Sequence, residues 1–281
     1  MIGFMQFYVF LIFLTFSLSA VNAGCDKYED CKSCAGADNG SCKFCLTTSK
    51  CLNIVGLNCQ KDNVIKNSFD CPVNVPPQEF AYDDKFARYT AFPLIAAAFN
   101  PNPQICFDNQ KLNFQLVEYR EVKCVSTKHN DTCASFVAYN NATNTVSVGF
   151  RGTSGNWELI EEILSILKGK NDFEGGGKVY SYFYNAFYNL FNNSISHGLT
   201  KAKQLCPNCD NLIVTGHSLG GSLASIFGTL AIHRKLFDAS KVKTITLGQP
   251  RTGDEAYAEA HDALHKYSYR VVHRKDPVPH L

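Results

Sequence analysis

One stretch constrains the fold more than any other, "NLIVTGHSLGGSLASIFGTLAIHR" at residues 211–234. Its short apolar start predicts a buried strand, and the longer apolar run that follows predicts a helix. Between them, Gly216-His217-Ser218-Leu219-Gly220 fits G-x-S-x-G, the pattern of a sharp strand-to-helix turn that presents a serine. We therefore predict that Ser218 is a nucleophile. The alternative is a glycine-rich turn before an ordinary helix.

Strands and helices alternate along the rest of the chain. We expect helices at 81–99, 183–205, 219–235 and 255–265, and strands at 114–119, 134–139, 145–150, 211–215, 242–248 and 267–273. This alternation predicts an α/β fold with a mostly parallel sheet covered by helices on both faces.

The N-terminus indicates secretion. Residues 1–24 carry no charged side chain and end in small residues, which predicts a signal peptide at 1–23; an uncleaved membrane anchor is the alternative. All thirteen cysteines follow it, which suits an oxidising compartment. Glycosylation sequons occur at Asn39, Asn130, Asn141 and Asn192. We expect an extracellular glycoprotein, with the lysosome as the alternative location. The net charge of +2 gives no case for nucleic acid as a partner.

Residues 25–71 hold eight cysteines in a segment too short to be stabilised by its core alone. Many pairings are open, so the sequence assigns none. The "CKSC" and "CKFC" pairs are compatible with zinc, but their short spacing and the predicted secretion favour disulfides, and we predict no metal. The run "CDKYEDCKSC…CKFCLTTSKC" resembles the plexin–semaphorin–integrin (PSI) module, which implies a structural or interaction role with an unidentified protein partner. A proline-rich linker at 72–80 follows, and the larger domain spans 81–281.

Three other segments could carry chemistry. "FRGT" at 150–153 follows a predicted strand, and "NWELIEEILSILK" at 156–168 is amphipathic. Asp276 lies just past the apolar strand "YSYRVV", where a carboxylate can reach the carboxyl edge of the sheet. Asp254 competes as a catalytic acid, but its place before "EAYAEAHDALHK" better suits a helix N-cap.

The blocks "VGFRGTSGNW", "VTGHSLGGSLA", "TLGQPRTGD" and "YRVVHRKDPVPHL" resemble, in this order, those of class 3 (fungal-type) lipases. The resemblance implies an α/β-hydrolase that cleaves lipid esters at a lipid–water interface without a metal or cofactor. It implies Ser218 as nucleophile and Asp276 as triad acid, with Leu219 and Thr153 as oxyanion donors.

The same resemblance implies that the amphipathic segment is a lid, with Trp157, Ile160 and Leu164 on it. A core-facing helix is the alternative, because amphipathicity does not separate the two.

A serine nucleophile needs a base, and none of the eight histidines fits that role. The family's catalytic histidine follows the aspartate by several dozen residues, whereas this sequence ends at Leu281. We therefore expect a lipase-like domain that is incomplete at its C-terminus. The alternative is a catalytically inactive, lipase-like binding or decoy protein. Five cysteines in the larger domain are an odd number; we expect Cys124–Cys133 and Cys206–Cys209 pairs and leave Cys106 unpaired.

Overall fold

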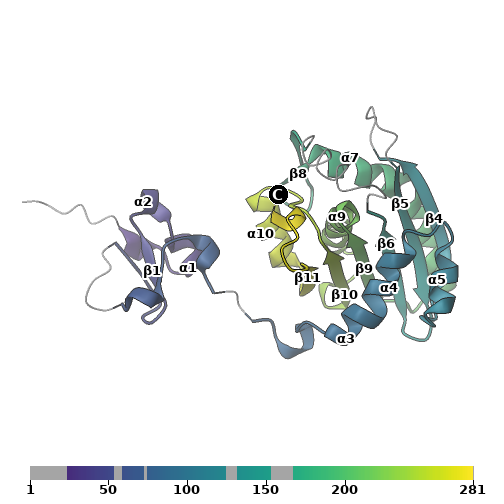
Figure 1. Cartoon of the computed structure of the whole chain (residues 1–281), viewed down its shortest axis with the longest axis horizontal. Helices are drawn as coiled ribbons and strands as arrows, with labels where there is room; N and C mark the ends of the chain where they lie inside the picture. Colours follow the sequence, from purple (N-terminus) through teal and green to yellow (C-terminus); the bar gives the residue numbers. More distant parts are fainter. Residues whose placement is uncertain (1–23, 54–58, 73–74, 125–131, 153–166, 281) are drawn as a thin grey trace, which may run out of the picture. The chain divides into compact units, whose positions relative to one another are not determined.

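The computed structural model describes residues 24–53, 59–72, 75–124, 132–152 and 167–280 (Figure 1). The chain divides into two units, Met1–Val75 and Pro76–Leu281, which are described separately below. The predicted signal peptide lies outside the described residues. Within them, no helix is both long and apolar enough to cross a membrane.

The smaller unit is a short, disulfide-linked fold. Its three-stranded sheet has the order β2-β1-β3, with β1 at Lys43–Cys45, β2 at Lys50–Leu52 and β3 at Val64–Ile65. Two single-turn helices, α1 (Cys31–Cys34) and α2 (Ala37–Gly40), precede the sheet. The buried cluster of this unit consists mainly of cysteines, so disulfides stabilise the unit in place of a larger apolar core.

All eight cysteines of this unit are paired. The disulfides are Cys25–Cys42, Cys31–Cys71, Cys34–Cys51 and Cys45–Cys59. Every cysteine of the two C-x-x-C pairs is therefore bonded to sulfur, which leaves no thiolate there for zinc.

The larger unit is an α/β domain with one six-stranded sheet in the order β11-β10-β9-β6-β5-β4. The strands are β4 (Gln115–Lys123), β5 (Thr132–Asn140), β6 (Thr145–Phe150), β9 (Asn211–His217), β10 (Val242–Leu247) and β11 (Tyr267–Val271). Ladders from β6 to β11 are parallel, and the two ladders that β5 makes are antiparallel. The predicted fold class is thus confirmed, with β5 the reversed strand in a mixed sheet.

Helices cover both faces of the sheet (Figure 1). One face carries α7 (Ser181–Leu190), α8 (Ser196–Leu205) and α9 (Leu219–His233), whose side chains join the main apolar cluster. The other carries α4 (Phe92–Ala97) and α5 (Pro103–Asn109). The helix α10 (Glu255–Leu264) packs against α9.

The helices expected at 81–99 and 183–205 are present, but each contains a π-helical segment that the sequence did not predict. The helix expected at 81–99 is a run of three segments, α3 (Asp84–Phe86), η5 (Ala87–Ala91) and α4, and the helix expected at 183–205 is two helices joined by the π-helical turn η6 (Phe191–Ile195). We did not predict α5, because Pro103 marked a break, yet proline is well suited to the first helical turn that it occupies. We also missed the hairpin of β7 (Lys170–Asp172) and β8 (Lys178–Tyr180), whose residues are mostly polar.

The two local disulfides expected in the larger unit are confirmed. Cys124 pairs with Cys133 and Cys206 pairs with Cys209, which leaves Cys106 as a free cysteine.

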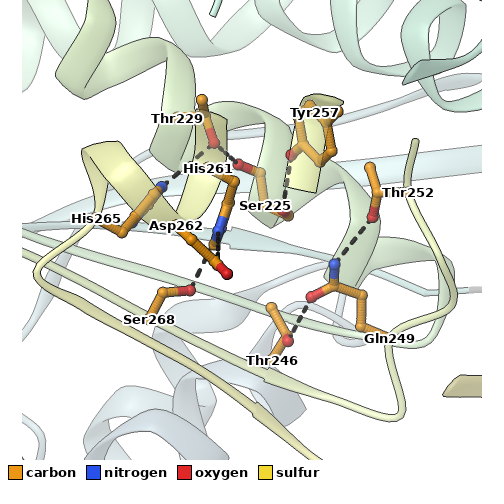
Figure 2. A network of polar contacts seen from close by, with 10 residues as sticks. All are labelled: Ser225, Thr229, Thr246, Gln249, Thr252, Tyr257, His261, Asp262, His265 and Ser268. Carbon is orange, nitrogen blue, oxygen red and sulfur yellow. Dashed lines mark hydrogen bonds and ion pairs between the residues drawn. The ribbon is translucent and has the colours of Figure 1, made fainter. Parts of the chain in front are cut away.

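A half-buried histidine at the C-terminal end of α10 joins it to α9 (Figure 2). His265 Nε2 lies 3.3 Å from Thr229 Oγ1, and its ring stacks on His261 with 4.1 Å between centroids. Its Nδ1 is buried without a hydrogen-bond partner among the described residues. Burial, with a smaller contribution from His261, holds the pKa of His265 well below its usual value, so the folded domain requires the neutral ring.

This depressed pKa predicts a loss of stability in mild acid. An unfolded histidine has a pKa of about 6.5, so the contribution of His265 is fully present above that pH and is lost as the pH falls toward the folded-state pKa. We expect His265→Gln to reduce the decrease in unfolding free energy between about pH 7 and pH 5. Urea unfolding at several pH values measures this.

His233→Gln is the matched control, because His233 is exposed at the end of α9. It should leave the pH dependence unchanged. An equally steep decrease in His265→Gln and the unaltered protein would contradict the assignment.

Candidate active site

Ser218 is the single residue between the end of β9 and the start of α9. Its backbone adopts φ 54° and ψ −125°, a strained conformation for a residue with a side chain. Its N–H donates to the Leu247 carbonyl at the end of β10 (2.9 Å), and its own carbonyl accepts from Gly221 N–H (2.9 Å). The backbone around Ser218 is therefore fixed from both sides, and Leu219, the first residue of α9, has an N–H with no partner inside the helix.

The glycines of the motif are required by close backbone contact. A Cβ on Gly216 would lie 2.1 Å from the Gly220 carbonyl oxygen, and one on Gly220 would lie 2.5 Å from the Phe150 carbonyl oxygen. Only hydrogen fits at both positions, so β9, α9 and the end of β6 meet backbone to backbone. The sequence prediction of a nucleophile-type turn at Ser218 agrees with this geometry.

The segment after β6 lies directly against this turn. A Cβ on Gly152 would lie 2.3 Å from the His217 carbonyl oxygen and 3.4 Å from Ser218 Cβ. Arg151 anchors the segment: its buried guanidinium pairs with Glu121 at 3.0 Å and donates to the Thr132 carbonyl at 2.8 Å. The hydrogen bond from Arg151 is also the main cause that lowers the pKa of Glu121. Sequence reasoning missed this anchor, although the arginine of "FRGT" was its signal.

Asp276 reaches the same edge of the sheet. A Cβ on Gly248, the residue after β10, would lie 3.0 Å from Asp276 Oδ2 and 3.7 Å from His217 Nε2. Asp276 Oδ1 accepts from Val278 N–H at 3.0 Å, which orients the carboxylate. Burial lowers the pKa of His217, and the Asp276 charge opposes that shift. Ser218 and Asp276 thus follow β9 and β11, which flank β10 in the parallel part of the sheet.

No histidine in the described part of the chain hydrogen-bonds Ser218 Oγ. The ring of His217 lies beside Gly248 and beside Phe99, with 6.2 Å between ring centroids. His261 and His265 belong to the α9–α10 contact in Figure 2. The remaining described histidines are exposed: His197, His233, His273 and His280. His197 Nδ1 also lies 3.7 Å from Glu118 Oε2.

Other predicted site residues divide into two groups. Thr153, Trp157, Ile160, Leu164 and Asn130 lie outside the described residues. Asn39, Asn141 and Asn192 are exposed, so a glycan would meet no steric barrier at the side chain.

Asp254 caps α10 as predicted, accepting from Tyr257 N–H at 2.9 Å and also from Lys178 N–H at 3.0 Å.

A buried polar chain that sequence reasoning did not foresee holds the turn after β10 (Figure 2). Thr246 Oγ1 donates to Gln249 Oε1 at 2.6 Å, and Gln249 Nε2 donates to Thr252 Oγ1 at 2.9 Å. Thr252 Oγ1 continues to Ser222 Oγ, in the first turn of α9, at 3.1 Å. These bonds link the loop beside Asp276 to α9, the helix that follows Ser218.

Comparison with known proteins agrees with this geometry. Residues 147–281 match the family described as lipase (class 3). A Caenorhabditis elegans protein, Lipase ZK262.3, is 32% identical over 208 residues, which cover 73% of this chain and 57% of the relative. The Rhizomucor miehei lipase is 32% identical over 57% of this chain and 43% of its own length. The secreted mono- and diacylglycerol lipase 1 of Fusarium solani is 32% identical over 52% and 42%.

The chain therefore spans about half the length of these curated relatives. Among solved structures, a lipase from Rhizopus microsporus var. chinensis superposes with a TM-score of 0.58 at 23% identity, covering 75% of each chain. At that identity the likeness shows the fold alone.

The contact between Gly152 and the turn makes a sharp prediction. Gly152→Ala places a methyl group against the His217 carbonyl, so the segment must move away from Ser218. We expect a loss of about 1–3 kcal/mol in unfolding free energy and a lower rate of Ser218 modification by a fluorophosphonate. Chemical denaturation and labelling followed by mass spectrometry measure the two effects.

Gly24→Ala is the control, because a Cβ there meets no atom closer than 3.5 Å. It should change neither quantity. A Gly152→Ala protein that is as stable and as reactive as the original would contradict the packing described here.

Proposed function

We propose that the larger unit, whose residues 147–281 match the lipase (class 3) family, is a lipid ester hydrolase unit with Ser218 as its nucleophile. The observation that carries the proposal is the backbone of Ser218, held at φ 54° between β9 and α9 by contacts that tolerate only glycine on either side. Ester hydrolases of the α/β type present their nucleophile in this way, on a strained backbone that its surroundings hold in one conformation.

The chemistry follows from this placement. Ser218 Oγ attacks the ester carbonyl carbon, the alcohol leaves with a proton, and water then releases the fatty acid and restores the serine. The oxyanion of each tetrahedral intermediate would accept from the Leu219 N–H at the start of α9 and from Thr153, the residue after Gly152. No metal or cofactor is required for these steps.

We propose Asp276 as the acid of the triad and a histidine base that is none of the described ones. Support for Asp276 is its place beside Gly248 and the orienting hydrogen bond from Val278. The Asp254 carboxylate caps α10 through Tyr257 N–H and also accepts from Lys178 N–H, which favours Asp276 over it as the acid. An attacking serine without a base is slow, because the base contributes orders of magnitude to the rate.

The substrate and setting are proposed from the relatives. A secreted mono- and diacylglycerol lipase is among them, which favours a lipid ester substrate at a lipid–water interface and an extracellular location for this protein. The segment at 156–168 would then act as the lid and the exposed sequons as glycosylation sites. The disulfide-linked unit is proposed to bind a protein partner.

Chemical rescue tests the proposal. We expect a fluorophosphonate to label Ser218 slowly in this chain and free imidazole to raise the labelling rate at least about tenfold, because it supplies a base that no described histidine provides. Ser218→Ala should show no labelling under either condition. Intact-mass and peptide mass spectrometry identify the modified residue.

Ser196→Ala, a change at the start of α8, should label like the unaltered protein. A folded chain whose Ser218 stays unlabelled even with imidazole would refute the proposed nucleophile. That result would favour the alternative, a lipase-like protein that binds without catalysis.

A further inference from the structure

A cavity opens at the end of the sheet opposite to Ser218. It has a volume of about 470 Å³ and is lined by the amino-terminal ends of β6, β9 and β10, by α3 and η5, and by the loop after α5. Ser218 lies six positions after Leu212, which lines this cavity, a span of roughly 20 Å in a strand. The cavity is therefore distinct from the candidate active site.

A lysine on an interior strand lines this cavity. Lys243 lies on β10, between Ile213 of β9 and Tyr267 of β11 in register. Its side chain is half-buried, and its ammonium lies 4.8 Å and 5.0 Å from the ring centroids of Phe86 and Tyr267. Within the described ranges it has no ion-pair partner, although a partly desolvated cation normally needs one. The cavity thus presents a cation that can still accept an anion.

The other charges around the cavity have the same sign. Lys111 lines it from the loop after α5 and makes no ion pair in the described part of the chain. Lys241, the residue before β10, also lines it and is paired with Asp210 at 3.6 Å. None of the lining residues is acidic. The local field therefore favours an anionic group.

The rest of the lining is mixed, with polar side chains such as Thr90, Gln110 and Thr143. Its apolar part includes the half-buried Leu112 and the buried Phe114 and Ile213. The amide groups of Asn140 and Asn211 donate to backbone carbonyls, so they are engaged within the protein. Phosphate sites commonly use arginine forks, and the lining contains no arginine. An anion with an apolar body fits this surface better than a compact, multiply charged one.

We propose that this cavity binds a fatty-acid carboxylate. The carboxylate lies against the Lys243 ammonium, with Lys111 nearby, and the acyl chain covers Leu112, Phe114 and Ile213. Fatty acids are the product class of the proposed hydrolysis, yet binding at this cavity does not require a reactive Ser218.

Titration of the full chain with decanoate, below its micelle concentration, tests the proposal. We expect saturable 1:1 binding that tightens up to about fourfold for each methylene added from hexanoate to decanoate. Decanol and decyltrimethylammonium, which have the same chain without the negative charge, should bind at least about tenfold more weakly. Equal binding of decanoate and decanol would overturn the proposed role of the lysines.

Substitution locates the site. Lys243→Met keeps the apolar stem and removes the charge, and we expect it to weaken decanoate binding at least about tenfold. Lys201→Met, on the exposed side of α8, should leave binding unchanged. If Lys243→Met, with an unchanged melting temperature, binds decanoate as tightly as the original, the inference is wrong and the fatty acid binds elsewhere, for example beside Ser218.

A measurement on the unaltered protein covers the case in which Lys243→Met does not fold. Decanoate should slow the acetylation of Lys243 by a water-soluble acetylating reagent and leave that of Lys201 unchanged. Absence of protection at Lys243 would overturn the inference. Ser218→Ala should bind decanoate normally, so a failure of the proposed hydrolysis and a failure of this site give different results.

Discussion

The larger unit depends on one steric requirement, that β9 turns into α9 within the single residue Ser218. The positive φ of Ser218 costs on the order of 1–3 kcal/mol and persists only if its surroundings over-determine it. They do so through the bonds to Leu247 and Gly221 and through α9 itself, whose residues 219–232 are all buried. A helix that is apolar on every side needs neighbours on every side, which the sheet, α7 and α10 supply.

Placement of the turn also determines what can meet there. In a parallel sheet the carboxyl ends of neighbouring strands share an edge, so the chain after β6, β10 and β11 arrives beside Ser218. Gly152 has no side chain to hinder this approach, and Gly248 leaves room for the Asp276 carboxylate. The buried Thr252–Ser222 bond holds the intervening loop against α9. The candidate site is thus a property of strand order as much as of the individual residues.

How far the sequence predicts this structure depends on the range of each interaction. Local patterns were sufficient for the turn at Ser218, for the cap at Asp254 and for the Cys206–Cys209 pair, because each is determined within a few residues. The contact of Gly152 with the turn joins segments that are far apart in the chain, so no local pattern predicts it. For the same reason, the sequence did not predict how the eight cysteines of the smaller unit pair.

The two ends of the sheet differ in charge in a way that a linear pattern conceals. In the sequence, Lys243 fits the alternation of β10 and looks like an ordinary polar residue. In the fold, the neighbouring strands and α3 partly enclose its ammonium group. Roughly 20 Å of strand separates that end from the Ser218 end. At that distance and an effective dielectric constant of about 20, the repulsion between the Asp276 carboxylate and an anion at Lys243 is on the order of 1 kcal/mol or less. The proposed carboxylate site and an ester at Ser218 are therefore only weakly coupled.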